Sequence, residues 1–445
     1  MPIHQQGKHA EKVCTILKSE LRKMPDAQRT PQAFVALLNT KLFKELPGGA
    51  PENVTEETAT VWMRYLGFER IEAKKDYYTD GHEREDVVAY RVEFLDKMKD
   101  YERRMGIWTG SEMNEFCSPC GLREREREVV LVTHDEMIVH ANDATRYFWL
   151  ERSSTKSIRP KSNGSSLMVS SGFSCQCHDF HGGTSSHIMK PGKNRDGYWT
   201  NAMLVEQLER VIPIFEAAHP GKTLLFAFDN SQNHHAKNPR ALTTAHLNLS
   251  DGGASDKFFL RDTVYNGIEQ KMQFEDRKGL HQKGLKRILQ ERGCWPPPCG
   301  SSVQGAKHEL DSHPDFMNEK IWLQEVVEKA GHELILYPKF HCELNYIEMV
   351  WAYVKRDLRS KCTFSYPDLQ ARLPQALNEV PIAYFKRVSR HCFRYMQGYR
   401  DGLVGPSLDY AMRKYSGHRA IPQDQLEVVK KEYEEQLCRK RQRVA

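Results

Sequence analysis

The middle of the chain alternates between short apolar runs and one longer amphipathic run, and this pattern restricts the fold. Apolar residues dominate 129–132, 146–150, 167–169 and 223–228, and each run is flanked by turn residues, as buried strands are. A mixed sheet with helices on its faces buries both kinds of segment, so the predicted fold class is α/β. Between the last two runs, apolar residues recur at helical spacing: Leu204, Leu208, Val211, Ile212 and Phe215.

Three carboxylates stand at the ends of such elements. Asp135 closes the segment 129–135, Asp229 follows the run 223–228, and Glu348 opens an amphipathic helix. Hard divalent cations such as Mg²⁺ prefer carboxylate, water and phosphate oxygen to nitrogen or sulfur. A pair of such ions is suited to phosphodiester chemistry. The pattern therefore predicts a site for two Mg²⁺ ions and a metal-dependent enzyme that cleaves and transfers nucleic-acid strands.

Length and composition fit a multidomain intracellular protein. A chain of 445 residues that is 39% hydrophobic can form two or three domains with a packed core. We find no apolar stretch near eighteen residues, and the first residues are polar, which argues against a membrane span or a secretion signal. The eleven cysteines are scattered, so most are expected to be reduced thiols in a soluble protein.

The domain organisation follows from changes in pattern along the chain. The N-terminal helices are either a helix-turn-helix reader of DNA or a small bundle that packs on the next domain, and the sequence leaves both open. Within the charged insertion we expect a helix over 278–290. The predicted segments are a helical region at 1–75, a helical linker at 76–125, the first part of the core at 126–239, the insertion at 240–325, the second part of the core at 326–366, and a helical basic region at 367–445.

Positive charge is concentrated late in the chain, although the net charge of +6 is only mildly basic. Such clusters are expected to hold DNA through phosphate contacts that weaken with salt. The clusters are Lys386 with Arg387, Arg390 with His391, Arg394, Arg400, Arg413 with Lys414, and the tail from Arg439 to Arg443.

Two cysteine pairs have spacings that occur in zinc sites. Cys117 and Cys120 are separated by two residues, and Cys175 and Cys177 by one. A single CxxC without a proven second pair is a weak signal for structural Zn²⁺. The spacing favours turns with free thiols over zinc.

The stretch KFHCELNYIEMVW at 339–351 resembles the mariner-like superfamily of DDE transposases, and it is most similar to a fungal branch of transposase-derived proteins. The resemblance covers about residues 53 to 420. Other matching stretches, in the same order as in that branch, are DGHEREDVVAYR at 80–91, HDE at 134–136 with AND at 141–143, KPGKNRDGYW at 190–199, DNSQNHH at 229–235 and KYSGHR at 414–419.

This resemblance implies an RNase H-like core with Asp135 on its first strand, Asp229 after its fourth and Glu348 on the following helix. The trio would be catalytic and would bind two Mg²⁺ or Mn²⁺ ions. It also implies DNA as partner, namely transposon ends and target, a homodimer in a synaptic complex, and a place in the nucleus. The mariner pattern separates its last two carboxylates by only a few dozen residues, so the longer segment after Asp229 must loop out of the core. Cys294 and Cys299 lie in it without a second pair, which argues against zinc there.

Each carboxylate also has a purely structural interpretation. An Asp followed by Asn230 and Ser231 is often a turn or a helix cap, and a Glu in a first helical turn often complements the helix dipole. For any one of the three alone the structural interpretation is favoured. Three in family order, each at the end of an apolar element, favour the metal site.

Accessory candidates surround the trio. His234, Asn230 and Lys355 are candidates for positioning water or phosphate, although His234 and its neighbour His235 fit equally well as surface histidines. Glu136 should point to the opposite face of the strand from Asp135.

Two further interpretations concern the third carboxylate and the function. The family pattern favours Glu348 over Glu343 as the third carboxylate. A catalytically silent, domesticated DNA-binding protein and a nuclease without strand transfer are the competing functions.

Overall fold

The computed structural model describes residues 8–24, 30–39, 54–68, 81–145, 160–174, 185–415, 426–428, 431–433 and 435. The chain divides into two compact units, one made of 1–76 with 430–445 and the other of 77–429. Among the helices in these ranges, none is both long and apolar enough to cross a membrane.

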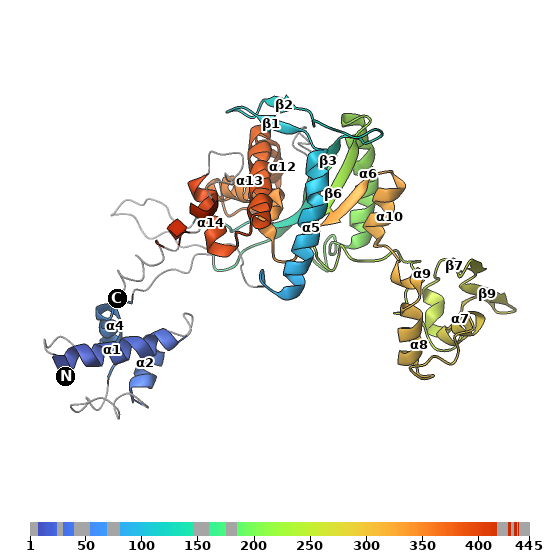
Figure 1. Cartoon of the computed structure of the whole chain (residues 1–445), viewed down its shortest axis with the longest axis horizontal. Coiled ribbons are helices and arrows are strands. Elements are labelled where there is room, and N and C mark those ends of the chain that lie inside the picture. Colours follow the sequence, from blue (N-terminus) through green and yellow to red (C-terminus); the bar gives the residue numbers. More distant parts are fainter. Residues whose placement is uncertain are drawn as a thin grey trace. The chain divides into compact units, whose positions relative to one another are not determined.

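A five-stranded mixed sheet lies at the centre of the larger unit (Figure 1). Its order is β11-β6-β3-β4-β5, in which β3 and β4, and β4 and β5, pair antiparallel, whereas β6 runs parallel to both β3 and β11. The predicted α/β class, an RNase H-like mixed sheet flanked by helices, is confirmed; the strand predicted at 146–150 lies outside the described residues. The strands are β3 (Val129–His140), β4 (Ser166–Ser174), β5 (His187–Met189), β6 (Thr223–Phe228) and β11 (Glu333–Leu336).

Alternation along the central strand directs side chains into two cores. Val129, Leu131 and Met137 of β3 pack in one core with residues of α5 (Glu85–Arg103), α11 (Tyr346–Ser360) and α13 (Ile382–Arg400). Val130 and Val132 pack in the other core with α6 (Asn201–Ala218) and α10 (Trp322–Lys329). Successive strand residues point to opposite faces, so each face of the sheet is covered by its own helices.

The segment predicted as a helical linker is helical only as far as Arg103. Beyond it, β1 (Ile107–Thr109) and β2 (Glu115–Cys117) form an antiparallel hairpin. Gly110 turns the chain between them with φ +83°, a conformation that glycine adopts without strain.

The insertion forms a core of its own around Leu285, Ile288 and Phe316. The helix expected over 278–290 is wrong in its first half, because this half is strand β10 and α7 begins only at Leu285. Gly284 marks the change, since a Cβ there would lie 2.3 Å from the backbone carbon of Ser250. The insertion contains η3 (Gly253–Lys257), β7 (Thr263–Tyr265), β8 (Ile268–Gln270), β9 (Gln273–Asp276), β10 (Gly279–Gln282), α7 (Leu285–Glu291), α8 (Val303–Asp311) and α9 (Pro314–Met317).

Beyond the core, α12 (Tyr366–Asn378), α13 and α14 (Gly405–Lys414) follow one another. Several basic side chains of α13 are used inside the protein. Lys386 lies 3.1 Å from the ring centroid of Trp108 and is buried, and Arg400 forms an ion pair with Glu102 at 2.7 Å. Arg394 donates to the carbonyl of Tyr415. The expectation that these three cations contact DNA phosphates is therefore wrong.

The smaller unit contains α1 (Lys8–Lys23), α2 (Pro31–Leu37) and α4 (Glu56–Tyr65) around buried Leu17, Phe34 and Trp62. Thr55 caps α4 by accepting a hydrogen bond from the Thr58 amide at 3.3 Å. Glu56 and Glu57 occupy the first turn of α4.

Candidate active site

Two parallel strands bring the two aspartates to one edge of the sheet. The last paired residues of β3 and β6 are Thr133 and Ala227, and Asp135 and Asp229 each follow two positions later. Because the period of a strand is two, both side chains leave the sheet on the face of Leu131 and Ala227, which is the face that α11 covers.

The third carboxylate is placed by the start of α11. Asn345 caps this helix, and its Oδ1 accepts from the Ile347 amide at 3.4 Å and from the Thr133 hydroxyl at 2.6 Å. The apolar face of this amphipathic helix is buried, including Ile347 and Trp351. Glu348 lies in the first turn and borders the cavity described next.

The structure brings the three predicted carboxylates to the wall of one cavity of about 420 Å³. They come from a strand, a strand end and a helix start, so the backbone fixes all three positions. The cavity is lined by Asp135, Asp229, Asn230, Ser231, Tyr337, Pro338, Lys339, Phe340, His341, Cys342, Asn345 and Glu348.

Asp135 and Glu348 repel each other when both are ionised. Burial raises the pKa of Asp135 well above its ordinary value, and the charge of Glu348 raises it further. Burial also raises the pKa of Glu348, against a hydrogen bond with Asp135 and the charge of Lys355. Two oxygen-donor groups that hold each other partly protonated would both ionise beside a divalent cation. The donor set thus fits hard divalent cations.

Asp229 differs from this pair because a buried histidine supports its charge. Burial acts to raise the pKa of Asp229, but the hydrogen bond and charge of His234 outweigh it and the pKa is lowered. The Nδ1 atom of His234 lies 2.5 Å from Oδ1 of Asp229. His234 is 0% exposed, so its interpretation as a surface histidine is wrong. The contact of its Nδ1 atom is with the carboxylate of Asp229.

The other accessory candidates are spread around the site. Asn230 lines the cavity, and its Oδ1 lies 2.5 Å from Nε2 of His235, which is exposed. Lys355 acts on Glu348 electrostatically without lining the cavity. Glu136 points to the opposite face, as predicted, where it accepts from Nε1 of Trp199 at 2.9 Å.

Sequence reasoning missed Lys339, Tyr337 and Asn345 as lining residues. The position of Lys339 just after an apolar strand was a signal for it. Because β11 runs parallel to β6 and their pairing ends at Leu336 opposite Phe228, residues just past both strands meet at the same edge of the sheet.

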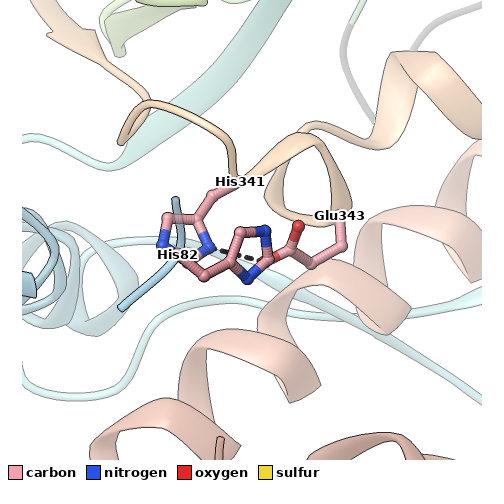
Figure 2. Close-up of side chains that lie close together, drawn as sticks. All are labelled: His82, His341 and Glu343. Atoms are coloured by element: carbon pink, nitrogen blue, oxygen red, sulfur yellow. Dashed lines mark hydrogen bonds and ion pairs between the residues drawn. The ribbon is translucent and has the colours of Figure 1, made fainter. Parts of the chain in front are cut away.

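Glu343 does not line the cavity. It belongs to a buried polar cluster with His82 and His341 (Figure 2). Its Oε1 accepts from Nδ1 of His341 at 2.7 Å and from the hydroxyl of Tyr399 at 2.7 Å. The ring centroids of His82 and His341 lie 4.2 Å apart, with the two planes tilted by 43°. Nη1 of Arg91 lies 3.3 Å from Nε2 of His341. Since arginine can only donate, His341 must accept there and give its proton to Glu343, which leaves that histidine no lone pair for a metal.

The cysteine candidates do not form a zinc site in the described part of the chain. Cys117 and Cys120 are exposed and outside any disulfide, and neither belongs to a group of three ligands among the described residues. Cys175 and Cys177 lie outside those residues.

No protein-family model and no curated protein matches the chain. Among solved structures it is similar to the "Mos1 mariner paired end complex with Mn" at a TM-score of 0.43 and 12% identity, covering 90% of this chain and 81% of that one. It is also similar to the "Mos1 Strand Transfer Complex" at a TM-score of 0.42 and 13% identity, with the same coverage. At these TM-scores the similarity does not identify the function of this chain.

Proposed function

We propose that the chain is a metal-dependent DNA endonuclease and strand transferase of the DDE transposase type, related to the fungal branch of the mariner-like superfamily. The observation that carries the proposal is the meeting of Asp135, Asp229 and Glu348 at one cavity on an RNase H-like sheet. The motif order along residues 80 to 419 supports the same assignment.

Asp135, Asp229 and Glu348 would hold two Mg²⁺ or Mn²⁺ ions. When bound, such ions would supply activation of an attacking oxygen and stabilisation of charge on a leaving oxygen. The protein's own contribution is to hold the ligands. His234 keeps Asp229 ionised, and the Thr133–Asn345 hydrogen bond fixes the start of α11 against β3.

DNA, as transposon ends and target, is the proposed substrate, acted on by a homodimer in the nucleus. Lys339 lines the cavity and is exposed, so its ammonium group is placed to contact a scissile strand's phosphates. Arg356, Arg387 and Arg413 are also exposed and provide sites for phosphate contacts that weaken with salt.

The full-length protein should nick supercoiled plasmid and join labelled duplex ends to it when Mg²⁺ or Mn²⁺ is present. Asp135→Asn and Asp229→Ala should each abolish both products, while DNA affinity, measured by anisotropy, stays within about twofold. Glu206→Gln, which removes an exposed carboxylate on α6, should behave as wild type.

Three other outcomes would decide against the proposal. DNA binding by the wild type without any cleavage would favour the silent, domesticated DNA-binding protein. Cleavage without joined products would favour a nuclease that lacks strand transfer. Cleavage that survives both aspartate substitutions would remove the trio from the chemistry altogether.

A further inference from the structure

A second cluster of metal-ligating groups lies behind the carboxylate cavity, on the other face of β3. His134 and Glu136 flank Asp135 and point toward α6, and His234 meets them from the loop after Asp229. One ligand atom from each of the three lies within 4.8 Å of the others. Both histidines are 0% exposed. Two imidazoles and a carboxylate are a donor set that suits zinc.

The hydrogen bonds around His134 determine which of its two ring nitrogens carries the proton. The amide of Gln207 donates from Nε2 to the carbonyls of Ser170 and Ser185, at 3.0 and 2.6 Å, so its Oε1 must be an acceptor. The hydroxyl of Ser170 donates to that Oε1 at 2.7 Å and therefore accepts from Nε2 of His134 at 2.9 Å. In the neutral ring, with the proton on Nε2, the lone pair is on Nδ1.

His234 presents its other nitrogen to the same place. Its Nδ1–H donates to Asp229, as described above, which leaves Nε2 facing Glu136. Burial acts to lower the pKa of His234, but its interactions with Asp229 and Glu136 outweigh burial and raise the pKa to about 10, so a metal would displace the proton from Nε2. The buried Nε2 atom lies 3.6 Å from Oε1 of Glu136, which is longer than a normal hydrogen bond. This distance is close to the separation of about 3.4 Å between two donors on a tetrahedral zinc with bonds of about 2.1 Å.

We propose that Nδ1 of His134, Nε2 of His234 and the carboxylate of Glu136 bind one zinc-type dication on the face of β3 opposite the carboxylate cavity. Each histidine donates its remaining N–H to an oxygen, one to the Ser170 hydroxyl and one to the Asp229 carboxylate. Such outer hydrogen bonds fix the tautomer and orientation of histidines that bind metals. The ion would hold His234 rigid and, through it, Asp229, so it is structural and does not depend on the proposed reaction.

The cluster of Cys294, Glu309 and His313 in the insertion provides a contrast. Nη1 of Arg292 donates to Nδ1 of His313 at 2.8 Å. His313 must therefore carry its proton on Nε2, the atom that faces Glu309 at 3.6 Å. A metal at this Nε2 atom would force the proton of the neutral ring onto Nδ1, where Arg292 already donates, so this cluster is the matched control.

The first test is Zn²⁺ binding by the full-length protein. The protein is stripped with a chelator, supplied with millimolar Mg²⁺ to fill oxygen-only sites, and titrated with Zn²⁺ against a chromophoric chelator. We expect one tight Zn²⁺ per chain. Glu136→Gln and His134→Gln should each weaken it by about 100-fold or more, and Asp229→Ala by about 10- to 100-fold, because it removes the acceptor of the His234 N–H.

Two controls keep this result specific. Glu309→Gln, in the contrasting cluster, and Glu348→Gln, in the carboxylate cavity, should leave Zn²⁺ affinity unchanged, although Glu348→Gln should abolish DNA cleavage. The zinc proposal and the proposed function can thus fail separately. Absence of tight Zn²⁺ binding, or its loss in Glu309→Gln with retention in Glu136→Gln, would overturn the zinc site.

A second measurement needs no variant and holds even if the substitutions unfold the protein. X-ray absorption at the zinc edge of the wild-type complex should show only nitrogen and oxygen neighbours, at about 2.0–2.2 Å, with imidazole scattering. A sulfur neighbour at about 2.3 Å would place the ion at cysteines and sink the assignment.

Discussion

The hydroxyl of Thr133 donates a 2.6 Å hydrogen bond to the side-chain oxygen of Asn345, and both residues are buried. Thr133 lies two positions before Asp135 on β3, and Asn345 caps the helix that carries Glu348 three positions later. One side-chain bond therefore sets the spacing between two of the three carboxylates. The hydroxyl of Tyr337 lies 3.3 Å from the same threonine and closes the cluster.

Thr133→Val should lower the free energy of unfolding by about 1–3 kcal/mol, because it keeps the shape of the side chain but removes the donor to a buried oxygen. Amide hydrogen exchange in the first turn of α11 should become faster, since the Asn345 cap is loosened. Thr133→Ser keeps the hydroxyl and loses one buried methyl, worth about 0.8 kcal/mol, so it should leave that exchange rate unchanged. Equal exchange in the valine and wild-type proteins would show that the bond does not hold the helix start.

Glu348→Gln should stabilise the protein in a chelator near pH 7, because it removes the charge that opposes ionisation of Asp135. The pKa of Asp135 is raised in the folded state, so that state binds more protons than the unfolded chain between the unfolded and folded pKa values. Stability of the metal-free wild type consequently falls as pH rises through this window and stays low above it. If removing the repulsion between residues 135 and 348 raises the free energy of unfolding by about 1 kcal/mol, the Tm should rise by about 2–4 °C.

Saturating Mg²⁺ should reverse this order, since the wild type gains the binding free energy and Glu348→Gln loses most of it. Calorimetric scans with Mg²⁺ and with chelator measure both differences. Two results together would contradict this prediction: Glu348→Gln has a lower Tm than the wild type in chelator, and Mg²⁺ raises the Tm of both proteins equally. Asp135 and Glu348 would then not be a strained cation site.

Local pattern was sufficient for the elements that carry the carboxylates. Apart from Thr223 the run 223–228 is apolar, and every residue of β6 is buried, because both faces of this strand are covered. The amphipathic pattern that begins at Glu348 likewise predicted the buried face of α11. These signals located the element ends at which Asp229 and Glu348 stand. Asp135, which was expected to close its segment, instead lies within β3, because this strand continues to His140.

Contacts between distant segments were beyond this kind of inference. Nothing near Asp229 in the sequence indicates that His234 turns back to hold it, or that Glu136 from another strand faces the same imidazole. The basic residues of α13 mislead for the same reason, since composition does not tell a solvated lysine from Lys386, which is buried against Trp108.

A buried ion pair should be critical to the insertion. Arg292 donates to both carboxylate oxygens of Asp315, at 3.0 and 2.7 Å, with the two side chains 1% and 10% exposed. Asp315→Asn leaves the guanidinium without its counter-charge and should destabilise the insertion by about 3–5 kcal/mol. Faster amide exchange in α7 and α8 would report it. Glu275→Gln, at an exposed carboxylate of the same insertion, should cost less than about 0.5 kcal/mol.

The same pair predicts a pH dependence. Burial acts to raise the pKa of Asp315, but hydrogen bonds from Arg292 outweigh it, and the pKa is lowered. The stability from this pair is therefore full above the unfolded value near 3.9 and is lost as pH falls through the lower folded value. Exchange in α7 and α8 should rise below about pH 4 in the wild type and change less in Asp315→Asn. Identical pH profiles in the two proteins would contradict this.

Replacing Gly81, beside the cavity, with a residue that has a Cβ should be costly. Its φ is +94°, and a Cβ there would lie 2.8 Å from Cε2 of Phe340, a cavity-lining residue. Gly81→Ala combines a left-handed backbone with a clash, whereas Gly121→Ala combines a similar φ of +87° with no atom within 4 Å. The second substitution should cost about 1–2 kcal/mol from the backbone alone, and the first should cost more because Phe340 must move.

Denaturant unfolding of the two alanine variants measures this difference. Phe340→Leu should recover part of the loss when combined with Gly81→Ala but should give no recovery with Gly121→Ala, because only the first pair shares a contact. Since Phe340 lines the cavity, Gly81→Ala should also slow DNA cleavage at a temperature where the protein is fully folded. Equal destabilisation by the two alanines would mean that Phe340 moves aside freely and that Gly81 is required for its backbone conformation alone.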